Sequence, residues 1–145
     1  MLSLPMSLAI VPLLLSLAVK SQMADAINRS CAESSTSTSY VEVHGRLAIY
    51  NGGYPNFRLW QIGTHHLFGI YGGPADFQCI RSFKCGGEEE TNLPDSVTRL
   101  FDAPNSFTVE VFGDFNIRLL EPFKQEHMQA ACIVSARNLV RQKKD

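Results

Sequence analysis

Two adjacent histidines are the residues whose type and spacing most suggest chemistry. They are His65 and His66 in the stretch QIGTHHLFGIY, directly after Gly63 and Thr64. Imidazole nitrogens bind transition metals and transfer protons near neutral pH. The stretch also alternates as a strand does, and neighbouring strand residues point to opposite faces. We therefore expect no shared metal ion: His65 joins a binding face, and His66 lies beside Gln61 at the end of the core face.

Catalytic motifs with a known mechanism are absent from the chain. It contains no G-x-S-x-G, no H-E-x-x-H, no phosphate-binding glycine loop and no G-x-G-x-x-G. Ser135, Asp114 and His44 have the types of a nucleophilic triad, but a triad is defined by geometry and their spacing does not favour one. Paired-carboxylate chemistry is equally unsupported. The sequence predicts no catalytic residue, no metal and no cofactor.

Composition limits the size and the partners of the protein. The chain has 145 residues, of which 45% are hydrophobic and 19% charged, so it fits one domain with its own core. Its formal net charge of -1 lacks the basic excess that a nucleic-acid binder uses to neutralise phosphates. We therefore expect no nucleic-acid partner.

The N-terminus has the layout of an export signal. Residues 2–19 are uncharged and rich in leucine, and Ala24 and Ala26 follow as an A-x-A cleavage site. No basic residue precedes the apolar run and Lys20 follows it, so an uncleaved membrane anchor is the alternative, which two prolines in the run weaken. We expect a secreted or periplasmic protein without a membrane span after cleavage. Its expected parts are a signal peptide (1–26), a flexible mature N-terminus (27–39), a single β domain (40–141) and a charged tail (142–145).

Export gives the cysteines a structural meaning. An even count, here four, indicates disulfides in an oxidising compartment, and four cysteines allow three connectivities. Cys79 and Cys85 are close enough in sequence to pair locally, which leaves Cys31 to pair with Cys132. A zinc site is the alternative, but no C-x-x-C pair is present.

Alternating apolar and polar residues from Tyr40 onwards predict strands. YVEVHGRLAIY, NFRLWQI and HHLFGIY form a three-stranded meander, joined by turns at NGG and at Gly63-Thr64, the second of type II′. A first turn over 51–53 pairs Leu47 with Phe57, Gly45 with Leu59 and His44 with Trp60. The second turn pairs Leu59 with Phe68, Phe57 with Ile70 and Trp60 with Leu67. The core face then consists of Val43, Leu47, Ile49, Phe57, Leu59, Phe68 and Ile70.

The rest of the chain is harder to interpret. Residues 72–92 are expected to form a long pinned loop or an irregular hairpin, and LPDSVTRLF a short helix near 95–101. NSFTVEVFGDFNIRLLEP is a hairpin or one bulged strand, and MQAACIVSARNLV fits a strand or a helix. The expected fold class is mainly β, a single-domain antiparallel sandwich or barrel-like fold built on the meander.

The outer face of the meander is the candidate binding surface. It places Arg46 directly opposite Arg58, and like charges in that position destabilise a sheet. Glu42, Asp114, or an anionic or glycan ligand stacked on Trp60 would neutralise them. A salt-bridged face covered by the rest of the fold is the alternative. The candidate ligand-binding residues are His44, Arg46, Arg58, Trp60 and His65.

The run HGRLAIYNGGYPNFRLWQIGTHHLFGI, with VFGDFNI and SARNLV, resembles a family of small uncharacterised exported bacterial proteins. The likeness covers residues 40–73 and 109–140, and the HGRL, YNG, R-x-W and IGT elements are specific as a set. The family has cysteines just before HGRL and after FGDF, where this chain has Tyr40 and Arg118, so no family disulfide is carried over. The resemblance implies a bacterial, exported, mostly β protein and no particular activity.

Together these observations predict an exported non-enzymatic β domain. Its expected role is a binding or envelope-associated module for an anionic, glycan or protein ligand. The alternatives are a small secreted hydrolase with a site near His44 and a purely structural protein.

Overall fold

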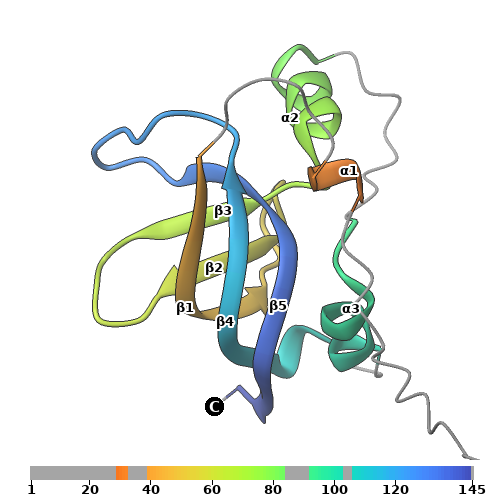
Figure 1. The fold of residues 1–145 in the computed structure, drawn as a ribbon. Coiled ribbons are helices and arrows are strands. Elements are labelled where there is room, and N and C mark those ends of the chain that lie inside the picture. The colour runs from red at the N-terminus through yellow and green to blue at the C-terminus, as the bar shows by residue number, and fades with distance from the viewer. Residues whose placement is uncertain (1–28, 33–38, 84–91, 103–105, 145) are drawn as a thin grey trace, which may run out of the picture.

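The computed structural model describes residues 29–32, 39–83, 92–102 and 106–144, which form a mainly β barrel with helices against it (Figure 1). The strands close in the order β1-β2-β3-β5-β4. The mainly β, barrel-like prediction is thereby confirmed, whereas the predicted signal peptide lies outside the described residues. In chain order the elements are α1 (Arg29–Ala32), β1 (Tyr40–Ile49), β2 (Phe57–Gln61), β3 (Leu67–Ile70), α2 (Pro74–Arg81), α3 (Asp95–Phe101), a 3-10 turn (Ser106–Thr108), β4 (Val109–Leu119) and β5 (Gln129–Lys143).

The first hairpin of the meander has a different register from the one predicted. Arg46 pairs with Trp60 rather than with Arg58, and Leu47 pairs with Leu59. The reason is the loop, which covers 51–55 instead of 51–53, because the Tyr50 N–H donates to the Asn56 carbonyl (2.9 Å). A shift of two residues keeps every side chain on its face, so the predicted core face stays correct while each predicted pair is wrong.

The second hairpin has the predicted register. The Thr64 N–H donates to the Gln61 carbonyl (3.2 Å) and Gly63 has a φ of 80°, which places the glycine third in a type II turn rather than in the expected type II′ turn. The pairs are Phe57 with Ile70, Leu59 with Phe68 and Trp60 with Leu67.

β1 is shared by both sides of the barrel because it can bend sharply at Gly45. This residue pairs with Gln61 of β2 and with Gly113 of β4. A Cβ atom at Gly45 would lie 2.6 Å from Leu59 Cδ1 and 2.9 Å from the Trp60 carbonyl oxygen, so no larger residue fits. The absence of a side chain here allows β1 to follow the curvature of a closed barrel.

The last two strands complete the barrel. β4 is one long strand with register shifts between Phe112 and Asp114 and between Asn116 and Ile117, so the bulged-strand alternative is the correct one. β5 is a strand rather than a helix and continues to Lys143, past the predicted domain end. It pairs antiparallel with β4 and parallel with β3, which makes the sheet mixed. This strand order is that of the OB-fold, a five-stranded Greek-key barrel.

Two helices lie between β3 and β4. α3 confirms the helix predicted near 95–101 and packs Phe101 edge-on against Phe57, with ring centroids 5.2 Å apart. α2 lies in the segment predicted to be a loop or hairpin, and that prediction is wrong for these residues. Cys79 in α2 is disulfide-bonded, and its predicted partner, Cys85, lies outside the described residues.

The segment before β1 is held to the outside of the barrel by what we call the N-terminal clasp, formed by Cys31, Ala32, Tyr40, Arg118 and Cys132. The predicted Cys31–Cys132 disulfide is confirmed, and the zinc alternative is therefore wrong for this pair. Arg118 is buried and donates from an Nη to the Cys31 carbonyl (2.9 Å). The Tyr40 hydroxyl donates to the Ala32 carbonyl (3.4 Å).

Among the described residues, no helix is both long and apolar enough to cross a bilayer.

Candidate functional site

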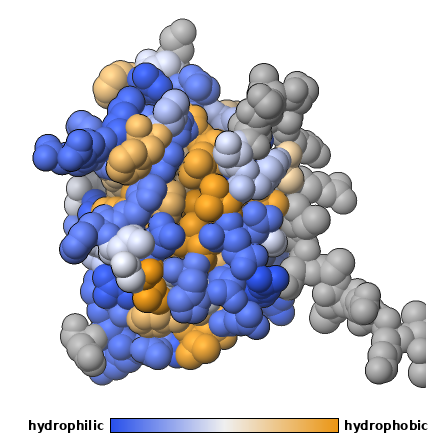
Figure 2. Space-filling view, turned by 60° about the vertical axis from the view of Figure 1, so that its left-hand side comes forward, coloured by the Kyte–Doolittle hydropathy of each residue, from blue (hydrophilic) through white to orange (hydrophobic). Residues whose placement is uncertain are grey.

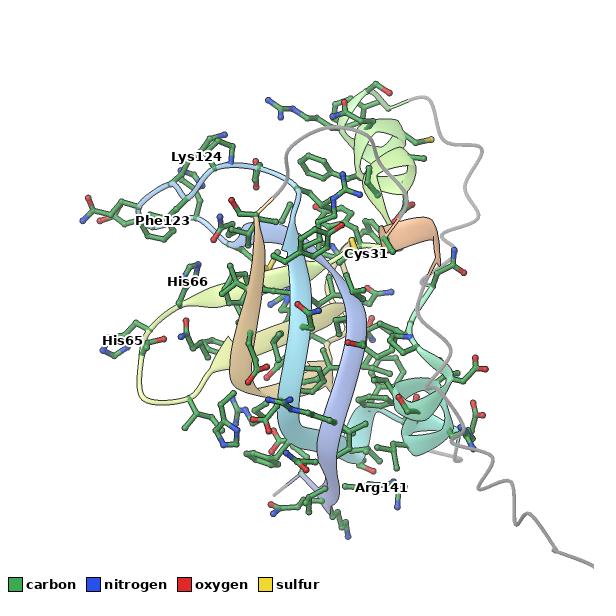
Figure 3. All side chains as sticks on the ribbon, viewed as in Figure 1. Cys31, His65, His66, Phe123, Lys124 and Arg141 are labelled. Carbon is green, nitrogen blue, oxygen red and sulfur yellow. A yellow bond between two sulfur atoms is a disulfide. The ribbon has the colours of Figure 1, made fainter. Side chains whose placement is uncertain are left out.

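A pocket of about 510 Å³, which we call the loop pocket, opens between two loops of the barrel. One loop, 62–66, joins β2 to β3, and the other, 120–128, joins β4 to β5; both project from the same side (Figure 1). Figure 3 shows His66 on the first loop and Phe123 on the second facing each other across the gap. The lining residues are Trp60, His65, His66, Leu67, Phe123, Glu126, His127 and Met128.

The floor of the loop pocket is the outer face of β2 and β3, where Trp60 pairs with Leu67. Trp60 Nε1 is buried and has no hydrogen-bond partner in the protein. The Arg46 guanidinium lies 5.6 Å from the centroid of the indole ring, within cation–π range. Figure 2 turns this side forward and shows hydrophobic surface between hydrophilic side chains. The floor thus offers the exposed part of an aromatic ring, with an unpaired N–H donor buried beneath it.

His66 forms part of the pocket wall and is held rigidly. Its Nε2 lies 2.9 Å from Gln129 Oε1. Gln129 donates from its amide nitrogen to the Glu121 carbonyl (3.0 Å), so its oxygen accepts and His66 Nε2 carries the proton. The imidazole stacks on Phe68 at 4.2 Å and meets the edge of Phe123 at 5.0 Å. His66 does share the core side with Phe68, as predicted, but it also lines the pocket, which the sequence did not indicate.

The adjacent histidines line one pocket. His65 and His66 are joined there by His127 and Glu126. Within residues 29–32, 39–83, 92–102 and 106–144, however, no group of three or more His, Cys, Asp or Glu side chains is placed to hold a metal ion. His65 is exposed at the pocket, whereas His66 already bonds to Gln129 and stacks on Phe68.

One end of the loop pocket is closed where the 51–55 and 120–128 loops meet over β3. The contact lies above Gly69, whose Cβ position is 2.6 Å from Pro55 Cγ and 2.9 Å from Met128 Cε. Glu121 anchors the base of the longer loop, because its carboxylate accepts the Ala130 N–H (3.1 Å). Side-chain packing and hydrogen bonds of the two loops thus define the shape of the pocket.

The two arginines of the predicted site are separated by the observed register. Arg46 forms an ion pair with Glu110 (3.3 Å), so the expected clash between Arg46 and Arg58 does not exist. Arg58 instead lies over the Tyr50 ring, with its Cζ 5.1 Å from the centroid, and Lys144 Nζ lies 4.1 Å from the same centroid. Arg58 Nε is buried without a hydrogen-bond partner. This aromatic and basic cluster borders the loop pocket through Trp60, the next outward residue of β2.

His44 does not line the loop pocket but belongs to a polar network across β1, β4 and β5. Its Nδ1 lies 2.8 Å from Asp114 Oδ1, and Asn138 donates to Asp114 Oδ2 (2.7 Å). These two hydrogen bonds, the one from Asn138 first, lower the pKa of Asp114, with attraction from Arg137 adding to the shift. Among the described residues no hydrogen bond joins Ser135 to His44.

The pocket residues that the sequence did not reveal come mainly from the 120–128 loop. Phe123, Glu126, His127 and Met128 lie in a stretch without helix or strand periodicity. One signal was present, since Phe123 is a large apolar residue among polar ones and is 61% exposed.

A scan against protein-family models finds no match for this chain, and searches of the curated proteins and of the solved structures find none. Function therefore has to be argued from the site, because one fold serves many functions. The fold determines where the site lies, and the residues of the site determine which chemistry is possible there.

Proposed function

We propose that the chain is an exported, non-enzymatic binding module that holds a glycan or another anionic ligand in the loop pocket. The observation that carries this proposal is Trp60, a half-buried ring on the pocket floor whose buried Nε1 has no partner within the protein. An unpaired buried donor costs free energy, and a shift of the ring toward an acceptor group of a ligand would recover it. The pocket is within the size range of small-ligand sites.

The position of the pocket supports the same proposal. OB-fold barrels bind oligonucleotides and oligosaccharides on the face of strands 2 and 3, using the loops between strands 1 and 2 and between strands 4 and 5. Here Trp60 and Leu67 supply the floor from β2 and β3, and the 120–128 loop supplies a wall. This support is an analogy of fold. Of the two ligand classes, glycans suit a chain with a net charge of -1 better than nucleic acids do.

Export is supported by chemistry as well as by the N-terminal sequence. Disulfides persist in oxidising compartments, and the structure contains the Cys31–Cys132 bond. The apolar run at 2–19 and the A-x-A site predict release of the mature domain into the periplasm or the medium. The mass of the exported protein tests this step: cleavage after Ala26 supports export as a released domain, and an intact N-terminus supports the anchored alternative.

Trp60 provides a direct test of binding because it is the only tryptophan of the chain. Titration with a panel of neutral and acidic oligosaccharides is expected to change its fluorescence, since no other indole contributes. By calorimetry, Trp60→Phe should keep ring stacking but lose the N–H donor, and Trp60→Ala should lose both. Affinity is therefore expected to fall in steps from wild type to Phe to Ala, with unchanged circular dichroism. Equal affinity of all three proteins, or unfolding of both variants, would refute the proposal.

A second candidate is a small hydrolase that uses His44. The observation in its favour is the 2.8 Å contact between His44 Nδ1 and Asp114 Oδ1, which resembles two thirds of a triad. A screen of the purified protein with ester, amide and glycoside substrates tests it against the His44→Ala variant. Turnover that requires His44 supports a hydrolase, and the absence of such turnover leaves the binding role or a purely structural one.

A further inference from the structure

We infer that the ligand of the loop pocket is an acidic oligosaccharide, whose charged group binds to Arg58 and Lys144 around the Tyr50 ring. We call these three residues the anion subsite. The inference rests on the proposed function, because the anion subsite adjoins the loop pocket, and it adds the charge and the position of the bound group.

The geometry places the anion subsite beside the stacking ring. Arg58 and Trp60 are separated by one residue on β2, so both point outward, about 7 Å apart along the strand. Tyr50 follows β1 on the same outer face, with Arg58 Cζ 5.1 Å and Lys144 Nζ 4.1 Å from its ring centroid. A ligand with one ring on Trp60 would therefore present a neighbouring substituent to the two cations.

The charges of this region are unbalanced. Some basic side chains of the described residues have carboxylate partners: Arg46 pairs with Glu110, Arg137 with Glu42 and Lys124 with Glu121. In the part of the chain that the structure describes, neither Arg58 nor Lys144 forms an ion pair, although both lie against one ring. Both cations lie against the Tyr50 ring, and an anion bound beside that ring would be attracted by each of them.

A second and independent observation is the buried Nε of Arg58, which has no hydrogen-bond partner in the protein. A guanidinium binds planar oxyanions through parallel N–H donors, and carboxylate and sulfate groups present such oxygen pairs. Lys144 would add a point charge without directional demands. The subsite thus fits the carboxylate of a uronic acid or the sulfate of a sulfated sugar.

An acidic glycan fits the site better than a nucleic acid because the site has few unpaired cations. Nucleic-acid binding depends on neutralising a series of phosphates. Here two unpaired cations adjoin one aromatic floor, and the chain as a whole has 13 basic against 14 acidic residues. One charged group next to one stacked ring is the pattern of a sugar chain with acidic substituents.

The test compares matched pairs of probes with the same sugar backbone. The first pair is oligogalacturonate and its neutral methyl ester, and the second is a sulfated oligosaccharide and its unsulfated form. A short oligothymidylate is added to test for nucleic-acid binding. Affinity is measured by Trp60 fluorescence at low and at high ionic strength. The wild-type protein is expected to bind the acidic member of a pair about tenfold more tightly at low ionic strength, and added salt should reduce this preference.

Three variants locate the effect. Arg58→Gln and Lys144→Met should each lose most of the acidic preference, about tenfold, and leave affinity for the neutral probe unchanged. Lys143→Met is the matched control, because it removes the same charge from the neighbouring residue of the chain, which makes no contact with Tyr50. It should keep the preference. If Arg58→Gln fails to fold, Lys144→Met still gives the answer.

The outcomes separate the inference from the proposed function. Trp60-dependent binding of sugars with no preference for the acidic members, or equal effects of Lys143→Met and Lys144→Met, would overturn the anion subsite and leave the binding module standing. Binding of no sugar at all would overturn both. Tighter binding of the oligothymidylate than of every acidic sugar would overturn the glycan assignment in favour of single-stranded nucleic acid.

Discussion

The N-terminal clasp and the loop pocket are two places where the outside of the same barrel is apolar, and the chain treats them differently. At the clasp it covers its own surface, since Cys31, Cys132 and Arg118 are almost fully buried under the α1 segment. At the loop pocket Trp60 and Leu67 remain partly exposed beneath two projecting loops. The first surface is covered by the protein itself, whereas the second is left partly open.

Hydrogen bonding distinguishes the two regions in the same way. At the clasp the buried Arg118 reaches the Cys31 carbonyl, and a disulfide fixes the covering segment in place. At the loop pocket and its border, Trp60 Nε1 and Arg58 Nε have no protein partner. Arg118 Nε is also unpaired, but it lies under the clasp where no ligand can reach it. The difference lies in the residues that carry these donors, since Arg118 is 2% exposed whereas Trp60 and Arg58 are partly exposed.

The largest expected effect comes from opening the clasp. The double variant Cys31→Ser, Cys132→Ser should lose about 4 kcal/mol of unfolding free energy, because the bond closes a long loop, with a separation of 101 residues, in the unfolded chain. Urea unfolding followed by circular dichroism measures the loss. Affinity of the folded protein for a pocket ligand should stay the same. A parallel loss of affinity would show that the two regions are coupled.

Gly69→Ala should have the next largest effect and act on the pocket side. Its new methyl group would lie 2.6 Å from Pro55 Cγ, so the two loops above β3 must move apart. Overpacking of this kind costs about 2 kcal/mol. We expect a lower urea midpoint together with weaker ligand binding, in contrast to the cysteine variant. A stable Gly69→Ala protein with full affinity would mean that the loop contact is not needed to shape the pocket.

Phe123→Ala should weaken binding without destabilising the barrel. The ring is largely exposed and its main contact is the edge of His66 at 5.0 Å, so the unfolding free energy should change by less than about 0.5 kcal/mol. Loss of one pocket wall should reduce ligand affinity about tenfold. Phe107→Ala, at another exposed phenylalanine outside the pocket, is the control and should leave affinity intact.

The smallest effect is expected from Asp114→Asn, and it should depend on pH. The pKa of Asp114 is lowered in the folded state by hydrogen bonds from Asn138 and His44, so its ionised form favours folding above the ordinary value of 3.8. That contribution disappears as the pH falls through the lowered pKa. The variant should therefore have a slightly lower urea midpoint than wild type at pH 7 and the same midpoint in strong acid. A difference that persists in acid would assign the effect to packing instead.

The core face was predictable because alternation reports which face a residue occupies and is unchanged by a shift of two residues. Leu47 and Leu59 were therefore placed inside correctly, although their predicted partners across the first hairpin were wrong. The register depended on the first loop, which covers 51–55 and not only the NGG of 51–53, because the Tyr50 N–H donates to the Asn56 carbonyl. The wrong register also led to a wrong prediction of charge repulsion at the site, because it paired Arg46 with Arg58 instead of with Trp60.

The rest of the site could not be read from the sequence because its parts come together through topology. The parallel pairing of β3 with β5 brings Leu67 and Met128 into one pocket, although some sixty positions separate them in the sequence. Alternation contains no information on which strands become neighbours. The predicted residues Trp60 and His65 line the pocket and His44 does not, a distinction that depends on the same pairing.

The position of β5 as the last strand of the barrel has a consequence for the order in which the protein can fold. β5 pairs with both β3 and β4, and it also supplies Cys132 for the bond to Cys31. Until a ribosome or a translocation channel has released residues 129–143, the first four strands have two open edges and cannot close. Closure of the barrel and formation of the Cys31–Cys132 bond are therefore both late events that wait for the last strand.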